Sequence, residues 1–194
     1  KSSITFPYYG AWSADVHMSV GDSLSGSASF VVGDLTLTGK VVRSGTFTAD
    51  TSARIVGGAA GWPTVLPAKG YSHTAGVKLS TVLGDAARAV GETISVATDR
   101  TIGTHWTRTE AKARDVLALL VGDRWWVDAA GVTQTGPRSG APIVTPFTVI
   151  SRDPARGSFV IASESIAPWQ PGRTFSCNTV PDVQTISSVT IESG

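Results

Sequence analysis

A serine in a short block of turn-forming residues is the first candidate for chemistry in this chain. Ser23 stands within residues 21–25 (GDSLS), and a serine hydroxyl attacks an ester only when a base, typically an imidazole, takes its proton. The chain contains three histidines, at His17, His73 and His105, and none has an aspartate three residues before it. Because no base is visible for Ser23, we expect a turn at this block and no catalytic residue in the chain. A serine esterase using Ser23 remains the least favoured alternative.

The same block matches the serine motif of one family of esterases and lipases. In that family the histidine belongs to a D-x-x-H motif near the C-terminus, whereas no histidine follows His105 here. The family also alternates helices with strands, while in this chain strand signals follow strand signals. The resemblance therefore stops at five small residues.

Metal, phosphate and redox sites need donors at characteristic spacings. The histidines form no H-x-H or H-E-x-x-H pattern, and the single cysteine, Cys177, excludes an internal disulfide and a Cys-rich zinc site. We interpret Cys177 as a small buried side chain in a C-terminal strand. The glycine-rich residues 57–61 lack the Lys-Ser/Thr of a phosphate loop, and Trp62-Pro63 follows them instead of a helix. We predict a flexible loop at 57–61, and no metal or cofactor.

Acidic and aromatic side chains leave binding functions open. The fifteen Asp and Glu residues offer many pairs for glycoside hydrolysis, but none has a diagnostic context. The six tryptophans can fill a core, anchor a protein interface or stack on sugars. We name Trp12, Trp62 and Trp169 as candidates for an interface. A carbohydrate- or receptor-binding module that uses exposed Trp is the main alternative function.

Charge and hydropathy narrow the remaining classes. The net charge is +1 and no two Lys or Arg are adjacent, whereas an electrostatic grip on nucleic acid needs clustered positive charge. The longest apolar stretches, such as residues 116–121, are far shorter than the roughly 20 residues that span a bilayer. Only 16% of residues are charged, and many are Ser, Thr and Val, which favours strands and a largely neutral surface.

Apolar periodicity places the elements that would position these residues. Strands are predicted at 28–32, 35–42 and 46–56, separated by turns at Gly33-Asp34 and Ser44-Gly45. A 3.6-residue period from Leu79 to Val90 predicts a helix that begins near Ala75 and ends at Gly91. A second helix is predicted from Thr109, as its N-cap, to Gly122.

The remaining segments again have strand patterns. A hairpin is predicted over 124–135 with its turn at Asp128-Ala129-Ala130, and further strands at 147–151, 158–164, 174–177 and 185–191. The layout predicts a β-dominated α+β fold in three parts. These are a barrel-like part at 1–71, a two-helix α/β segment with a hairpin at 72–136, and a second barrel-like part at 137–194.

Several of these segments resemble the baseplate hub and late-control proteins of bacteriophage tails. They are residues 33–39 (GDLTLTG), residues 61–71 (GWPTVLPAKGY), the helix at 77–91, and the block 109–136, where a helix ending in Gly leads into Trp-Trp-Val-Asp. The resemblance spans most of residues 28–192 and carries no catalytic residues. It implies small β-barrel tube-type domains interrupted by an α/β segment.

The resemblance also implies a structural role in the virion without catalysis. Such hubs form a ring at the tail tip, here expected to be a trimer made in the host cytoplasm, between the tail tube and a central spike or fibre. The expected partners are further copies of the chain and the tail tube, tape-measure and spike or fibre proteins. DNA would pass the lumen without specific binding, which agrees with the lack of basic clusters.

Overall fold

The structure is a computed structural model that describes residues 1–19, 21–138, 140–178 and 180–193. Strands dominate and the described residues contain two helices, which confirms the predicted β-dominated α+β class. Buried apolar side chains gather in three clusters, one in each of the parts described below. Within the described residues, neither helix is long and apolar enough to cross a membrane.

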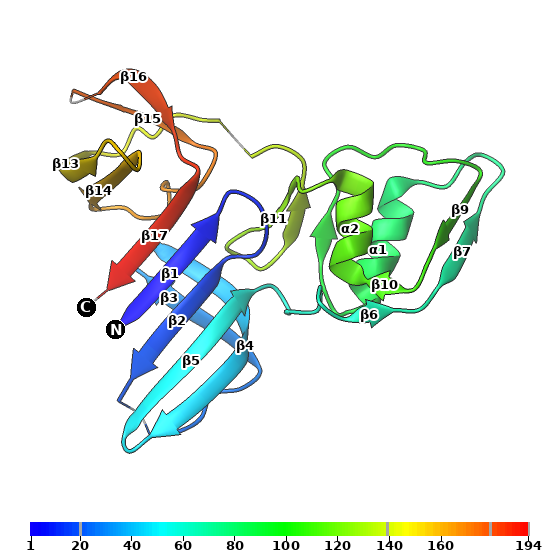
Figure 1. Ribbon diagram of the computed structural model, residues 1–194, viewed down its shortest axis with the longest axis horizontal. Coiled ribbons are helices and arrows are strands. Elements are labelled where there is room, and N and C mark those ends of the chain that lie inside the picture. Colours follow the sequence, from blue (N-terminus) through cyan, green and yellow to red (C-terminus); the bar gives the residue numbers. More distant parts are fainter. Residues whose placement is uncertain (20, 139, 179, 194) are drawn as a thin grey trace.

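The largest sheet has six strands in the order β17-β1-β2-β5-β4-β3, and each neighbouring pair is antiparallel (Figure 1). Its strands are β1 (Ser2–Pro7), β2 (Ser13–Met18), β3 (Ser27–Val32), β4 (Leu35–Phe47), β5 (Asp50–Gly57) and β17 (Ser188–Ser193). The C-terminal β17 pairs with β1 along its whole length. The part predicted at 1–71 therefore receives a strand from the part predicted at 137–194.

This sheet buries one face because its residues alternate. In β4, Leu35, Leu37 and Gly39 are buried, while the threonines between them are exposed. The sheet curls around Trp12, whose ring lies 6.1 Å from Phe6 and 5.9 Å from Phe30, and β3 passes behind β1 in Figure 1. The two edge strands, β17 and β3, do not pair with each other in the described part of the chain.

The turn between β4 and β5 lies beyond the predicted position. Ser44-Gly45 falls inside β4, because the ladder with β5 continues to the Phe47–Asp50 pair and the turn is Thr48-Ala49. Thr48 has a φ of 57°, which is unusual for a β-branched residue. Pairing with β5 on one side and a hydrogen bond from Leu24 N to Ser44 Oγ on the other outweigh the local turn tendency of glycine.

The two helices and seven short strands form the middle part. These are β6 (Val65–Leu66), β7 (Lys69–Ser72), α1 (Leu79–Ala89), β8 (Ile94–Ser95), β9 (His105–Arg108), β10 (Ala111–Lys112), α2 (Ala113–Val121), β11 (Trp125–Val127) and β12 (Thr133–Thr135). β6 pairs with β10 and β7 with β9, so residues 65–71 belong with the helices rather than with the first sheet. The predicted hairpin is confirmed as β11 and β12, with Gly131 N donating to Asp128 O across its turn.

Both helices begin later than the sequence predicts: α1 starts four residues beyond Ala75, and the N-cap of α2 lies three residues beyond Thr109. Residues 78 and 112 precede them in extended conformation, and no local side chain caps either N-terminus. Distant groups accept the first N–H bonds instead: Asp99 Oδ1 accepts from Ser80 N, and the Trp62 carbonyl accepts from Arg114 N. The C-terminal ends fit the prediction, because Gly91 and Gly122 have positive φ there.

The C-terminal part consists of two separate two-stranded sheets in the described residues. They are β13 (Phe147–Asp153) with β14 (Ser158–Ser163), and β15 (Thr174–Cys177) with β16 (Val180–Thr185). Phe147, Phe175 and Trp169 pack between them, with ring centroids 5.0–5.9 Å apart. These rings belong to the core cluster of the C-terminal part.

Asp34 ties the first sheet to the C-terminal part. Its Oδ1 accepts hydrogen bonds from Ile166 N at 2.7 Å and Ala167 N at 3.1 Å, and its Oδ2 accepts one from Ser165 Oγ. These bonds, with the Ser165 bond foremost, lower the pKa of Asp34 to about 2. The segment they hold places Ile166 and Ala167 against the core of the first sheet.

This tether predicts a loss of stability in acid. The folded pKa of Asp34 lies below the unfolded value of 3.8, so its contribution is complete above about pH 4 and disappears as the pH falls towards 2. We expect Asp34→Asn to lower the urea midpoint near pH 5 and to have a progressively smaller effect towards pH 2, where wild-type Asp34 is also neutral. A midpoint difference that stays constant over this range would contradict the tether.

Candidate functional site

Ser23 does not meet an imidazole. It lies exposed in an irregular segment, and among the described contacts none joins a histidine ring to it. The Nδ1 of His17 contacts Ser52 Oγ at 2.8 Å, and the Nδ1 of His73 accepts a hydrogen bond from Ala75 N. In the described part of the chain, no three His, Cys, Asp or Glu side chains converge as metal ligands.

The 21–25 block instead supports the end of the β4–β5 hairpin. Gly21 N donates to Ala49 O at 3.0 Å, and Thr51 Oγ1 donates to the Asp22 carbonyl at 2.9 Å. Leu24 N donates to Ser44 Oγ at 2.9 Å. These three hydrogen bonds hold the hairpin tip from one side, which is compatible with the turn predicted at residues 21–25.

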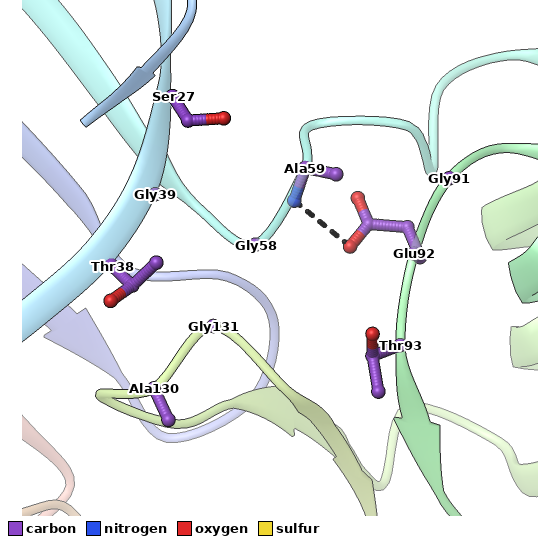
Figure 2. A pocket seen from close by; sticks show the side chains of 10 residues that line it. All are labelled: Ser27, Thr38, Gly39, Gly58, Ala59, Gly91, Glu92, Thr93, Ala130 and Gly131. Carbon is purple, nitrogen blue, oxygen red and sulfur yellow. Dashed lines mark hydrogen bonds between the residues drawn. The ribbon is translucent and has the colours of Figure 1, made fainter. Parts of the chain in front are cut away.

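The glycine loop at 57–61 binds an anion from its own chain. Glu92, which is buried, accepts a hydrogen bond from Ala59 N at 3.0 Å (Figure 2). It accepts another from Gly61 N at 2.6 Å. Amide groups that could face a phosphate are therefore occupied by a carboxylate. No local pattern points to Glu92, because this residue lies more than thirty positions beyond the loop whose amides it accepts from.

Close backbone contacts surround this carboxylate and explain the glycines. A Cβ on Gly61 would overlap the Val90 carbonyl, and one on Gly131 would lie 2.9 Å from Thr38 O. The cavity here has a volume of about 210 Å³ and includes Thr38, Gly58 and Thr93 in its lining. Figure 2 shows the turn at Ala130-Gly131 and the loop at Gly58 facing each other across it.

The same place joins the first sheet to the helical part. Thr38 N donates to Ala129 O at 2.8 Å, and Trp12 Nε1 donates to Asp128 O at 3.1 Å. The 57–61 loop, which the sequence predicts to be flexible, is held by Glu92 and by a hydrogen bond from Gly57 N to Trp12 O at 2.9 Å. The cavity and the Glu92 carboxylate therefore lie at the junction that orients the first sheet relative to the helical part.

Replacing Glu92 should loosen this junction. In Glu92→Ala the amides of Ala59 and Gly61 lose their acceptor, and we expect the free energy of unfolding to fall by ~2–3 kcal/mol. Glu92→Gln retains an acceptor oxygen and should lose about half as much. Urea titration measures both, and hydrogen exchange should show faster exchange at these two amides; unchanged exchange in Glu92→Ala would contradict this role.

The three candidate interface tryptophans all lie inside the folded chain. Trp12, Trp62 and Trp169 are 1%, 4% and 8% exposed, and each belongs to a different core cluster. Trp62 Nε1 also donates to Thr133 Oγ1 at 2.9 Å. Because none of these rings faces solvent, they provide no platform for a sugar or a partner, and the core-filling alternative fits them.

A four-residue polar cluster was not predicted. Asp85 on α1 contacts Lys69 Nζ through Oδ1 at 2.6 Å, and its Oδ2 accepts from Tyr71 Oη at 2.7 Å and lies 3.5 Å from a guanidinium nitrogen of Arg108. Arg108 is 3% exposed. Burial of Asp85 opposes its ionisation, but the hydrogen bonds from Lys69 and Tyr71 and the two positive charges hold its pKa below the usual value. Burial, then the bond to Asp85, raises the pKa of Tyr71 to about 12.

This cluster attaches the β7–β9 pair to α1. Arg108 Nε also donates to Pro67 O at 3.2 Å, and the Tyr71 ring packs 5.8 Å from that of Trp106. Each of the four side chains bonds to at least one other member of the cluster, so Asp85 is bonded rather than directed at open space.

Exposed apolar side chains are the last feature of the described surface. Phe47, at the tip of the β4–β5 hairpin, is 85% exposed, and Val144 is 90% exposed. Val144 lies on a groove of about 490 Å³ between residues 143–149 and 176–178, and all ten lining residues are uncharged. Exposed apolar side chains beside an uncharged groove are typical of surfaces that bind other proteins.

Comparison with known proteins shows what the chain's fold is similar to. A 43 kDa tail protein of the prophage MuSo2 from Shewanella oneidensis aligns with a TM-score of 0.53 and 12% identity, over 73% of this chain and 49% of that one. The tail protein from Neisseria meningitidis MC58 aligns with a TM-score of 0.52 and 16% identity, over 80% of this chain and 52% of that one. The chain thus spans about half the length of each, and at these identities the likeness shows the fold alone. No protein-family model and no curated protein matches the sequence.

Proposed function

We propose that this chain is a structural component of a bacteriophage tail, and more specifically that it forms a hub ring at the tail tip. The observation that supports it most is the shared fold with two phage tail proteins over 73% and 80% of the chain. The resemblance of segments within residues 28–192 to hub and late-control proteins supports the same assignment.

The geometry of the described residues is compatible with a role in assembly. The candidate nucleophile has no imidazole partner, the glycine loop is filled by Glu92, and the polar cluster at Asp85 is bonded within itself. Apolar surface remains exposed at the hairpin tip and beside the C-terminal groove. In the proposed ring, which we expect to be a trimer, such surfaces meet other copies or the tube and spike proteins.

Two measurements test this proposal. Native mass spectrometry and electron microscopy of the purified chain should show closed rings of three copies, and a chain that stays monomeric at high micromolar concentration would overturn the ring. Antibodies against the chain should label the tail tips of virions that carry its gene. Labelling that is absent from virions, or confined to capsids, would overturn the tail role itself.

The two alternative functions now have less support. Glycan binding through Trp62 or Trp169 needs exposed rings, and both are buried. Ester hydrolysis needs a base near Ser23, and the described contacts provide none. Assay of a model ester with wild type and Ser23→Ala checks the second: equal background rates are expected.

A further inference from the structure

The β4–β5 hairpin presents one aromatic side chain in a rigid form. Phe47 is 85% exposed, and it directly precedes a two-residue turn. Three hydrogen bonds from residues 21–24 and Thr51 hold the last rungs of the hairpin. Because the tip is already ordered, binding through Phe47 would cost little conformational entropy. A pre-ordered, exposed aromatic is the kind of residue that carries most of an interface's binding energy.

The groove of the C-terminal part has matching properties. It lies between the segment Ile143–Val149 and residues 176–178, with a volume of about 490 Å³. In the described residues, β13 pairs only with β14, and its residues Phe147–Val149 belong to the lining of the groove. Val144, which is 90% exposed, provides apolar surface there, and no charged side chain lines the groove.

The two features match in charge and cannot meet within one molecule. Residues 44–49 at the tip are uncharged, as are the residues that line the groove, in a chain where one residue in six is charged. Figure 1 shows the β4–β5 turn at one end of the six-stranded sheet and the β13–β16 part at the other. The tip of one copy therefore reaches only the groove of another.

We propose that the Phe47 tip of one copy docks in the Ile143–Val149 groove of a second copy of this chain. The contact is heterologous, because different surfaces of the two copies meet, and repetition of such a contact gives a ring if the rotation between copies closes. The inference rests on the proposed function, for which it names the contact that joins neighbouring copies.

Variants at the two surfaces test the contact. Phe47→Glu and Val144→Glu should each weaken self-association at least roughly tenfold in sedimentation equilibrium, as loss of an interface anchor does. Leu119→Glu is the matched control, because Leu119 is 75% exposed on α2, away from both surfaces, and it should associate like wild type. Melting temperatures of all three should stay close to wild type, since each side chain is exposed.

A mixture of two variants makes the test specific. Phe47→Glu and Val144→Glu chains, each monomeric alone, should form a heterodimer when mixed, because the unchanged Phe47 tip of the second chain then meets the unchanged groove of the first. Rings that persist in Phe47→Glu and Val144→Glu would overturn this contact while the ring itself stands. A wild-type chain that remains monomeric would overturn both.

The single cysteine offers a direct distance measurement. Cys177 lines the groove, so a Phe47→Cys chain should form disulfide-linked multimers under mild oxidation, and Phe47→Cys with Cys177→Ser should show much less multimer. Leu119→Cys is the control for random collisions. Equal cross-linking of the Leu119 and Phe47 variants, or cross-linking independent of Cys177, would contradict the proposed docking.

Discussion

Replacing Trp12 by alanine is expected to lower the free energy of unfolding by ~3–5 kcal/mol, the range for removal of a large aromatic from a core. The Trp12 ring is 1% exposed and packs against Phe6 and Phe30 at the centre of the curled sheet. The substitution also removes the bond from Trp12 Nε1 to Asp128 O, which joins the first sheet to the helical part. Urea titration monitored by circular dichroism gives the change directly.

This variant also separates a core role from an interface role for Trp12. Trp12→Phe keeps most of the apolar surface and should lose clearly less stability, and Leu119→Ala on the exposed side of α2 should stay within about 0.5 kcal/mol of wild type. If Trp12 instead anchored a partner, Trp12→Ala would lose self-association with its unfolding midpoint unchanged. That result would contradict its placement in the core.

The second large effect is expected at Asp85. Asp85→Ala removes the only carboxylate bonded to Arg108 in the described contacts. The guanidinium, which is 3% exposed, then keeps only the Pro67 carbonyl and the Tyr71 hydroxyl as acceptors among these contacts. Breaking a buried pair in this way costs about 3 kcal/mol or more, because the remaining charge stays desolvated. Thermal or urea unfolding should show this loss, and the β7–β9 amides should exchange faster.

A matched pair on the surface provides the control. Asp115 lies 3.5 Å from Arg114, and both side chains are more than half exposed. Asp115→Ala should therefore change stability by less than about 0.5 kcal/mol. Similar losses for Asp85→Ala and Asp115→Ala would show that burial of Arg108 does not set the cost.

Local patterns determined much of the secondary structure. The alternation in residues 35–38 predicted a strand with one buried face, and the 3.6-residue stripe from Leu79 to Val90 predicted α1, whose members of the stripe up to Ala87 are buried. Gly91, Gly122 and the Asp128–Gly131 turn were predictable because positive φ and tight turns select a few residue types locally. The β-dominated class followed from these segments together.

Other features depended on contacts between distant residues. The helix N-termini lie at 79 and 113 because Asp99 and the Trp62 carbonyl accept from the second amide of each helix, so no local cap residue marks them. The hairpin passes through Ser44-Gly45 because β5 continues the ladder there. In both cases tertiary hydrogen bonds outweighed a local preference that is worth only about 1 kcal/mol.

For the candidate residues, the sequence by itself determined which chemical groups are present, and the tertiary structure decided what each one meets. The spacing around Ser23 and the histidines already lacked a catalytic pattern, but only the fold showed Glu92 filling the glycine loop and Trp12, Trp62 and Trp169 buried in separate cores. Tryptophan is compatible with a core or an interface, because the same apolar surface stabilises both. Which one it occupies depends on how the strands curl, and β17, from the far end of the chain, completes that sheet.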